Sequence, residues 1–226
     1  LKLDNVHVTG SFVGGSTAGI LASDCHTSID NITIANSSVC GGKYTGGVVG
    51  YGYTYVTNCT LTNCVIKGGY KLGGVIGYIC TENGVPHDVT GCTLTGCTVS
   101  GTDGQYADGK SEYVMGKVVG NYNCNGTCSN NTVVTTMATE ATNIIGKIET
   151  GKNVTIENNV VGISVYGLTL IPDGENSKII VKDKEGFLNL TRLFAEWTVL
   201  FSNGQETDIT NFYVENGGKG ADYYYS

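Results

Sequence analysis

The sequence is poor in charge, arginine and proline, and these shortages exclude several classes of protein. Of its 226 residues 15% are charged, two are prolines, Arg192 is the single arginine, and the formal net charge is −7. Nucleic-acid binding needs a basic surface that neutralises phosphates, so we expect no nucleic-acid partner. The same shortage argues against a polybasic patch that binds membrane surfaces.

Long hydrophobic runs are missing too. The chain has no stretch of about 18 apolar residues, so we expect no membrane-spanning segment. It begins at Leu1 without an initiator methionine or a signal peptide, and we therefore expect a processed form or a piece of a longer protein. Charged residues become denser after Gly162, which predicts two units, 1–162 and 163–226.

Glycine, by contrast, is abundant, with 34 residues, and it marks an internal repeat of about 28 residues. The clearest copies are Gly46-Gly47-Val48-Val49-Gly50 and Gly73-Gly74-Val75-Ile76-Gly77. Related runs are Ala18-Gly19-Ile20-Leu21-Ala22, Gly116-Lys117-Val118-Val119-Gly120 and Ile145-Gly146-Lys147-Ile148. A polar insert at 102–112 lengthens one of the units.

Each unit holds three short stretches of alternating hydrophobicity, bounded by Gly, Asn or Thr, and these predict three strands. One unit cannot bury its own apolar face, so neighbouring units must stack, about 4.8 Å apart. The sequence therefore predicts an all-β fold, a right-handed parallel β-helix of about five coils. In-register stacking would place Asn31 beside Asn58 and Asn130 beside Asn158. An array of immunoglobulin-like sandwiches is the alternative, although its usual repeat is about 100 residues.

The glycine-rich units from Thr17 to Val161 resemble the GLUG motif repeats of bacterial surface proteins. That resemblance implies a secreted or surface-anchored protein, as in large adhesin-like chains and some IgA peptidases, in which the repeats are not the catalytic part. The chain departs from the motif where Ala18 and Ala22 replace glycines, and where Lys117 and Lys147 replace the second glycine.

Residues 163–226 differ in character from the repeats. Stretches 163–171 and 178–182 predict strands, and Asp183 can cap an amphipathic helix over 184–197. We expect a small α+β capping or linker segment, because the open end of a solenoid exposes unpaired backbone and apolar core. The tail that follows Asn203 has no clear period.

Nine cysteines cannot all pair within one chain. Cys59 and Cys92 share a repeat position with Ile32, which predicts small buried hydrophobes rather than ligands. Two further pairs are predicted to share positions, Cys64 with Cys97 and Cys25 with Cys80. Zinc binding and disulfides between stacked positions are the alternatives. The pair expected least in the core is Cys124 and Cys128, in an Asn-rich stretch.

Catalysis by glycoside hydrolysis needs two carboxylates about 5–9.5 Å apart, hence acidic residues at matching positions of adjacent coils. None is found, because Asp30 aligns with Thr57 and Thr90, and Asp24 with Gly52 and Ile79. The one polar cluster, His26 with Asp24 and Cys25, is interpreted as a solvated turn. We predict no catalytic residue, no metal and no cofactor.

Tyrosine supplies the candidate binding residues, with 14 copies in the chain. Tyr44, Tyr70 and Tyr113 precede glycine runs and predict one ladder, and Tyr51 and Tyr78 follow runs and predict a second. Such ladders offer a platform for sugar rings, or else simply cover the strand ends. The candidate residues are Tyr44, Tyr51, Tyr53, Tyr55, Tyr70 and Tyr78, with Asp103, Tyr106 and Asp108 in the insert.

These observations predict a non-catalytic β-solenoid, secreted or at the cell surface, that serves adhesion or glycan binding. Its partners would be host or environmental glycans or surface proteins. Two alternatives stay open, a carbohydrate-active enzyme of the β-helix type (a polysaccharide lyase or glycosidase) and a purely structural stalk.

Overall fold

A computed structural model describes residues 1–10, 16–102, 113–165, 168–171, 178–181 and 213–216. These residues are all-β, and no helix occurs among them. The chain forms two compact units, Leu1–Val160 and Val161–Ser226. The helix predicted over 184–197 lies outside the described residues.

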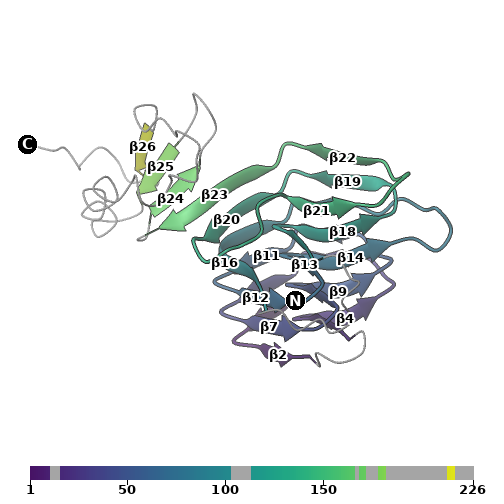
Figure 1. The fold of residues 1–226 in the computed structure, drawn as a ribbon. Coiled ribbons are helices and arrows are strands. Elements are labelled where there is room, and N and C mark those ends of the chain that lie inside the picture. Colours follow the sequence, from purple (N-terminus) through teal and green to yellow (C-terminus); the bar gives the residue numbers. More distant parts are fainter. Residues whose placement is uncertain (11–15, 103–112, 166–167, 172–177, 182–212, 217–226) are drawn as a thin grey trace, which may run out of the picture. The chain divides into compact units, whose positions relative to one another are not determined.

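The first unit is a stack of coils that are joined by parallel strand pairing (Figure 1). Each full coil passes through five strand positions, which we call sheets A to E. Sheet A holds β1 (Lys2–Asp4), β6 (Thr33–Ala35), β11 (Thr60–Thr62), β16 (Thr93–Gly101) and β20 (Thr132–Thr136). Sheet B holds β2 (His7–Thr9), β7 (Ser38–Gly41) and β12 (Val65–Gly68), and is continued by β16.

The glycine-rich runs lie where sheets C and D meet. Sheet C holds β3 (Thr17–Gly19), β8 (Tyr44–Gly46), β13 (Lys71–Gly73) and β17 (Val114–Gly116). Sheet D holds β4 (Ala22–Cys25), β9 (Val49–Gly52), β14 (Ile76–Cys80), β18 (Val119–Asn123) and β21 (Ile145–Ile148). Sheet E holds β5 (Ile29–Asp30), β10 (Val56–Thr57), β15 (Val89–Thr90), β19 (Gly126–Ser129) and β22 (Val154–Glu157).

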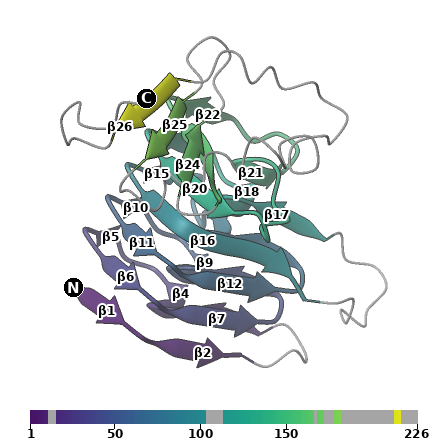
Figure 2. The same ribbon diagram turned by 90° about the vertical axis from the view of Figure 1, so that its left-hand side faces the viewer.

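The predicted parallel stack is confirmed, but the prediction of three strands per coil is wrong. Figure 2 shows β1, β6, β11 and β16 in successive layers, with β2, β7 and β12 continuing three of them. Residues 56–62, for example, form two strands, β10 and β11, which are separated at Asn58. The backbone of Asn58 has a φ of 53°, which turns the chain there.

Asparagines in this left-handed conformation mark two corners of the coil. At the corner between sheets E and A they are Asn31, Asn58, Asn130 and Asn158, with Gly91 in the middle coil. At the corner between A and B they are Asn5, Asn36 and Asn63, followed by Gly96. Asparagine and glycine adopt this conformation at the least cost. The pairing of Asp30 with Thr57 confirms the prediction that Asn31 lies beside Asn58. The row of asparagines at the corner between sheets A and B was not predicted.

The glycine run makes the corner between sheets C and D too tight for a side chain. A Cβ on Gly46 would lie 2.0 Å from the carbonyl oxygen of Val49, and one on Gly73 equally close to that of Ile76. Gly46 pairs with Gly73, and Gly73 with Gly116, so the same contact repeats up the stack. The repeated glycines in the sequence are therefore explained by a steric requirement at the corner between sheets C and D.

The core fills the inside of the coils with residues that stack on their own repeat partners. In sheet A these are Ile34, Leu61, Leu94 and Val133, all without solvent exposure. The shared position of Cys59, Cys92 and Ile32 is confirmed, and both thiols are fully buried, as are those of Cys64 and Cys97.

Two cysteine predictions are wrong. Cys124 and Cys128 are fully buried, and Cys128 lies in β19 beside Val89 of the coil before. Cys25 pairs with Gly52, and Gly52 with Ile79, so Cys80 does not share its position.

The second cysteine error has a single origin in the first repeat unit. Gly19, not Ala18, pairs with Gly46, so the strands around this run, up to Cys25, lie one residue away from their predicted register. Asp24 consequently lies beside Tyr51 instead of Gly52. The predicted neighbours of Asp30 are confirmed, because Thr57 pairs with both Asp30 and Thr90.

In the second unit the described strands form their own pairs. Stretch 163–171 was predicted as one strand, but β23 (Val160–Val165) and β24 (Leu168–Ile171) pair antiparallel across it. β25 (Lys178–Val181) follows close to its predicted place and pairs antiparallel with β24. β26 (Tyr213–Asn216), which pairs parallel with β25, was not predicted.

Candidate functional site

Four tyrosines gather on the outer face of sheet D and the adjoining edge of sheet C. Tyr51 and Tyr78 are paired in register, and their ring centroids lie 5.5 Å apart at an interplanar angle of 17°. Tyr44 of β8 stacks on both rings, at 5.6 Å from Tyr51 and 4.8 Å from Tyr78. Tyr53 meets Tyr51 edge-on at 5.4 Å. We call these four residues the tyrosine strip.

The predicted Tyr51–Tyr78 ladder is confirmed, and the other ladder is wrong in part. Tyr70 does lie next to Tyr113, since the amide of Val114 donates to the carbonyl of Tyr70. Tyr44 pairs with Lys71 instead, one residue out of that register. Its ring nevertheless approaches that of Tyr70, at 6.2 Å.

The remaining candidate residues are not part of the tyrosine strip. Tyr55 packs edge-on against His87, at 5.1 Å, around the corner between sheets D and E. Asp103, Tyr106 and Asp108 lie outside the described residues.

The rings of Tyr44, Tyr51 and Tyr78 stack face to face. The groups of the strip that remain for a ligand are therefore the ring edges and the hydroxyls. The Tyr51 hydroxyl donates to that of Tyr53 at 2.7 Å, and Asn123 Nδ2 donates to the Tyr78 hydroxyl at 2.6 Å. Burial raises the pKa of Tyr44 and Tyr51, and raises that of Tyr78 to about 12. The hydroxyls therefore stay protonated at neutral pH and can both donate and accept.

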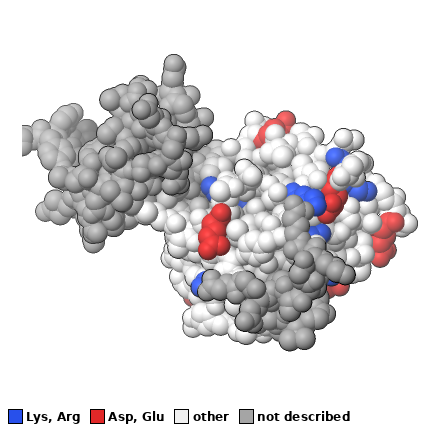
Figure 3. All heavy atoms as spheres, in the orientation of Figure 1, with Lys and Arg blue, Asp and Glu red and all other residues white. Residues whose placement is uncertain are grey.

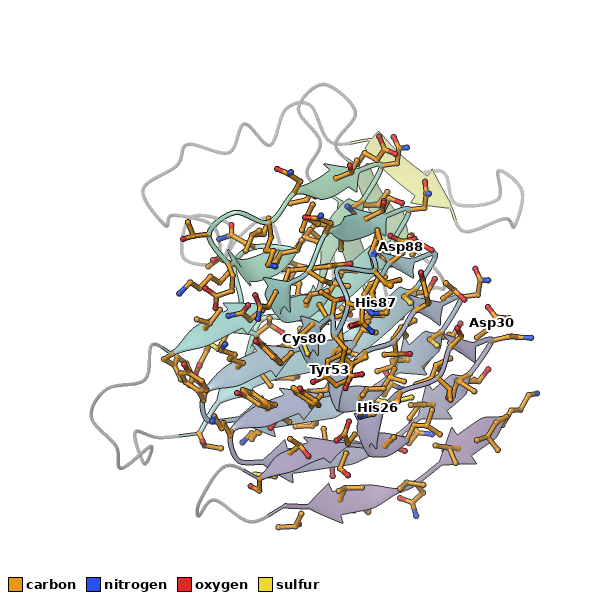
Figure 4. All side chains as sticks on the ribbon, turned by 90° about the vertical axis from the view of Figure 1, so that its right-hand side faces the viewer. His26, Asp30, Tyr53, Cys80, His87 and Asp88 are labelled. Carbon is orange, nitrogen blue, oxygen red and sulfur yellow. The ribbon has the colours of Figure 1, made fainter. Side chains whose placement is uncertain are left out.

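Toward the first coil the strip continues into His26 and Asp24. The His26 ring lies 4.8 Å from that of Tyr53, and its Nε2 lies 3.1 Å from Asp24 Oδ1. Figure 4 shows His26, Tyr53 and Cys80 on successive coils, with Asp30 set apart from them. Both side chains of the His26–Asp24 pair are more than half exposed, as expected for a solvated turn.

Neither cysteine near this cluster is arranged as a nucleophile. The Cys25 thiol donates to the carbonyl oxygen of Thr27 at 3.1 Å. Burial raises the pKa of the Cys80 thiol, although the hydroxyls of Tyr51 and Tyr53 act in the opposite direction. A buried thiol with a raised pKa is a poor nucleophile.

Toward the later coils the strip meets a charged cluster. Lys71 Nζ lies 4.1 Å from the ring centroid of Tyr78 and 3.5 Å from Glu149 Oε1. The same carboxylate oxygen accepts a hydrogen bond from Asn121 Nδ2 at 2.7 Å, and Lys147 Nζ lies 3.6 Å from the other oxygen. Lys71 and Asn121 are both buried.

Sequence reasoning missed Lys71, Asn121, Asn123 and Glu149. A signal for Asn121 was present, because it directly follows Gly120, as Tyr51 and Tyr78 follow their glycines. Its register partner is Tyr78. Lys71 and Glu149 gave no such signal, since they meet only when the coils stack.

The strand register also shows whether two carboxylates lie close enough for glycoside hydrolysis. No described strand pair places two carboxylates opposite each other, and Asp30 and Glu157 lie at opposite ends of the row Asp30, Thr57, Thr90, Ser129 and Glu157. Within the described ranges, no group of three or more His, Cys, Asp or Glu side chains could hold a metal ion. Nor is any helix in that part of the chain long and apolar enough to cross a membrane.

Charged side chains are sparse on the face shown in Figure 3, where most described residues are uncharged. The fold thus defines a parallel β-solenoid that carries the tyrosine strip on the outer face of sheet D and the adjoining edge of sheet C. No protein-family profile matches the chain, and neither a curated protein sequence nor a solved structure does.

Proposed function

We propose that the first unit is a non-catalytic binding module that holds carbohydrate on its tyrosine strip. The observation that carries this proposal is the in-register stack of Tyr51 and Tyr78, joined by Tyr44 and Tyr53. It presents hydroxyls and ring edges from two neighbouring coils, with the ring centroids of Tyr51 and Tyr78 at 5.5 Å. Such a surface combines apolar area with hydrogen-bonding groups, which is what a sugar ring needs.

We place this module among surface-displayed or secreted adhesins of the GLUG-repeat type, wound as a right-handed helix. The support is the repeated glycine corner and the low charge of the chain, 15% of its residues. An extended row of weak contacts suits a polymer, because several sugar units engage several coils at once.

The test is a glycan array probed with the wild-type chain and with Tyr51→Ala and Tyr53→Ala variants. We expect each substitution to weaken binding about tenfold, equivalent to about 1.4 kcal/mol, a common cost of truncating a contacting tyrosine. Lys67→Ala, an exposed residue of β12 on sheet B, is the matched control and should bind as the wild type does.

Circular dichroism of each variant shows whether the solenoid is retained. Equal binding by the wild type and both tyrosine variants would remove the tyrosine strip as the site. A wild-type chain that binds no glycan at all would leave the module as a spacer.

A further inference from the structure

Lys71, Asn121 and Glu149 come from three successive coils and meet through one oxygen atom. Lys71 belongs to β13, Asn121 to β18, and Glu149 follows β21. Glu149 Oε1 lies 3.5 Å from Lys71 Nζ and 2.7 Å from Asn121 Nδ2. The lysine amine and the side-chain amide therefore approach the same carboxylate oxygen.

This cluster is unusually buried for such polar groups. Lys71 is 7% exposed and Asn121 is fully buried. The Lys71 amine is surrounded by aromatic rings, with centroids at 4.1 Å for Tyr78, 5.3 Å for Tyr70 and 5.7 Å for Tyr44. Asn121 Oδ1 is also buried, and it has no hydrogen-bond partner within the described part of the chain. A buried amide with an unsatisfied oxygen is costly, so the fold holds Asn121 in this position at the expense of stability.

Two of the ionisable groups in the cluster have shifted pKa values. Burial lowers the pKa of Lys71, against the opposing effect of Glu149, which increases the share of neutral amine. The hydrogen bond from Asn121, helped by Lys147 and Lys71, lowers the pKa of Glu149 and keeps it a carboxylate. A neutral amine, an amide carbon and a carboxylate base are the parts needed for amide transfer.

We propose that Lys71 and Asn121 join in an intramolecular amide bond, with Glu149 as the proton carrier. Lys71 Nζ attacks the side-chain carbonyl carbon of Asn121 and forms a new carbon–nitrogen bond. Glu149 takes a proton from Nζ and delivers it to Nδ2. The bond from the carbonyl carbon to Nδ2 breaks, and one ammonia molecule leaves. No oxidant, reductant or metal takes part.

The bond would fasten two neighbouring coils at the side of the stack. β13 and β18 belong to successive coils, which otherwise hold together through backbone pairing and core packing. A covalent link between them resists peeling of one coil from the next, as a disulfide does by constraining the unfolded chain. This inference does not depend on carbohydrate binding.

Intact-mass spectrometry of the purified full chain is the test. We expect a mass lower than that of the sequence by one ammonia molecule, and a branched peptide that joins the segments around Lys71 and Asn121 after proteolysis. The branched peptide matters because a succinimide at an Asn-Gly site, such as Asn83-Gly84, also releases ammonia. Full mass and no branched peptide in the wild type would show an ion pair only and would overturn the proposal.

Variants of the three residues separate the roles. Lys71→Arg keeps a cation in the aromatic surroundings but should give no branched peptide, and Glu149→Gln should slow its formation at least tenfold. Asn121→Asp should form the same bond with loss of water in place of ammonia. Lys147→Arg keeps the second ion pair of Glu149, so it is the matched control and should still form the bond. A branched peptide that persists in Lys71→Arg would assign the bond to another residue.

Discussion

Single residues at the corners set the path of the chain. Of the non-glycine residues with a positive φ in the described part of the chain, all are asparagines, between 49° and 56°. Most other residues pay about 1–2 kcal/mol to adopt this conformation, whereas asparagine can bond locally and glycine has no Cβ. The side chains also bond between coils, as where Asn58 Nδ2 donates to Asp30 Oδ1 at 2.9 Å. Asn-x-Ser/Thr sequences occur at Asn31, Asn36, Asn58 and Asn130, and the turn accounts for the asparagine in each.

Substitution of Asn63 separates the backbone requirement from the side-chain contacts. Asn63→Ala should lower the free energy of unfolding by about 1–2 kcal/mol, because its φ of 52° is strained for alanine. Asn63→Gly should cost less, since glycine already serves at the equivalent Gly96. Urea denaturation measures both values. If the glycine variant loses as much stability as the alanine variant, the side chain rather than the backbone is responsible.

At the scale of elements, the short strands depend on the glycine corner between sheets C and D. Gly73 ends β13, and a Cβ there would also lie 2.7 Å from the backbone nitrogen of Gly120 in the next coil. Since these contacts are to backbone atoms, no side-chain rotation can relieve them. The corner is thus fixed from two coils at once.

Gly73→Ala should destabilise the solenoid by about 3 kcal/mol or more, the upper range for overpacking a tight site. Gly84→Ala, in the loop after β14, is the comparison, because a Cβ there meets nothing within 4 Å. It should cost only about 1–2 kcal/mol, owing to its φ of 74°. Thermal unfolding followed by circular dichroism measures the difference. Equal losses at both positions would contradict the steric explanation of the repeat.

At the scale of the whole first unit, each coil contacts mainly its two neighbours. Stability in such a stack is close to a sum of coil terms and interface terms. An end coil has one neighbour and can open alone, whereas a central coil cannot open without separating the stack. The first coil is held to the second by backbone bonds such as that from the Asn5 amide to the Ala35 carbonyl, at 3.1 Å.

Leu3→Ala and Leu72→Ala should therefore differ in the extent of unfolding they cause. Leu72 is fully buried in a central coil, and its truncation should cost about 2–5 kcal/mol in global stability. Leu3 is partly buried in the first coil. Its replacement by alanine should mainly accelerate hydrogen exchange within that coil, including the Asn5 amide. Exchange followed by NMR or mass spectrometry resolves the two patterns. Uniform acceleration in Leu3→Ala would show that the stack opens as one unit.

The stacking of the coils can be predicted from the sequence, because glycine spacing and alternating apolar residues repeat along the chain. The sequence also indicated that Asn31 and Asn58 are neighbours in the stack, that Cys59 and Cys92 lie in the core, and that Tyr51 and Tyr78 form a ladder. The predictions for Gly19, Asp24 and Cys25 were wrong because the first repeat was aligned one residue away from its true register. A one-residue shift costs little in a sequence alignment, yet it turns every side chain to the opposite face.

Which residues from different coils share a surface becomes clear only in the folded chain. Tyr44 joins Tyr51 and Tyr78 from another sheet, and Lys71 meets Asn121 and Glu149 from later coils. Lys71 and Glu149 are 78 positions apart in the sequence, and no local pattern links them. Repeats encode which positions stack, but contacts across a corner depend on the angle between sheets and on side-chain length, which the fold alone sets.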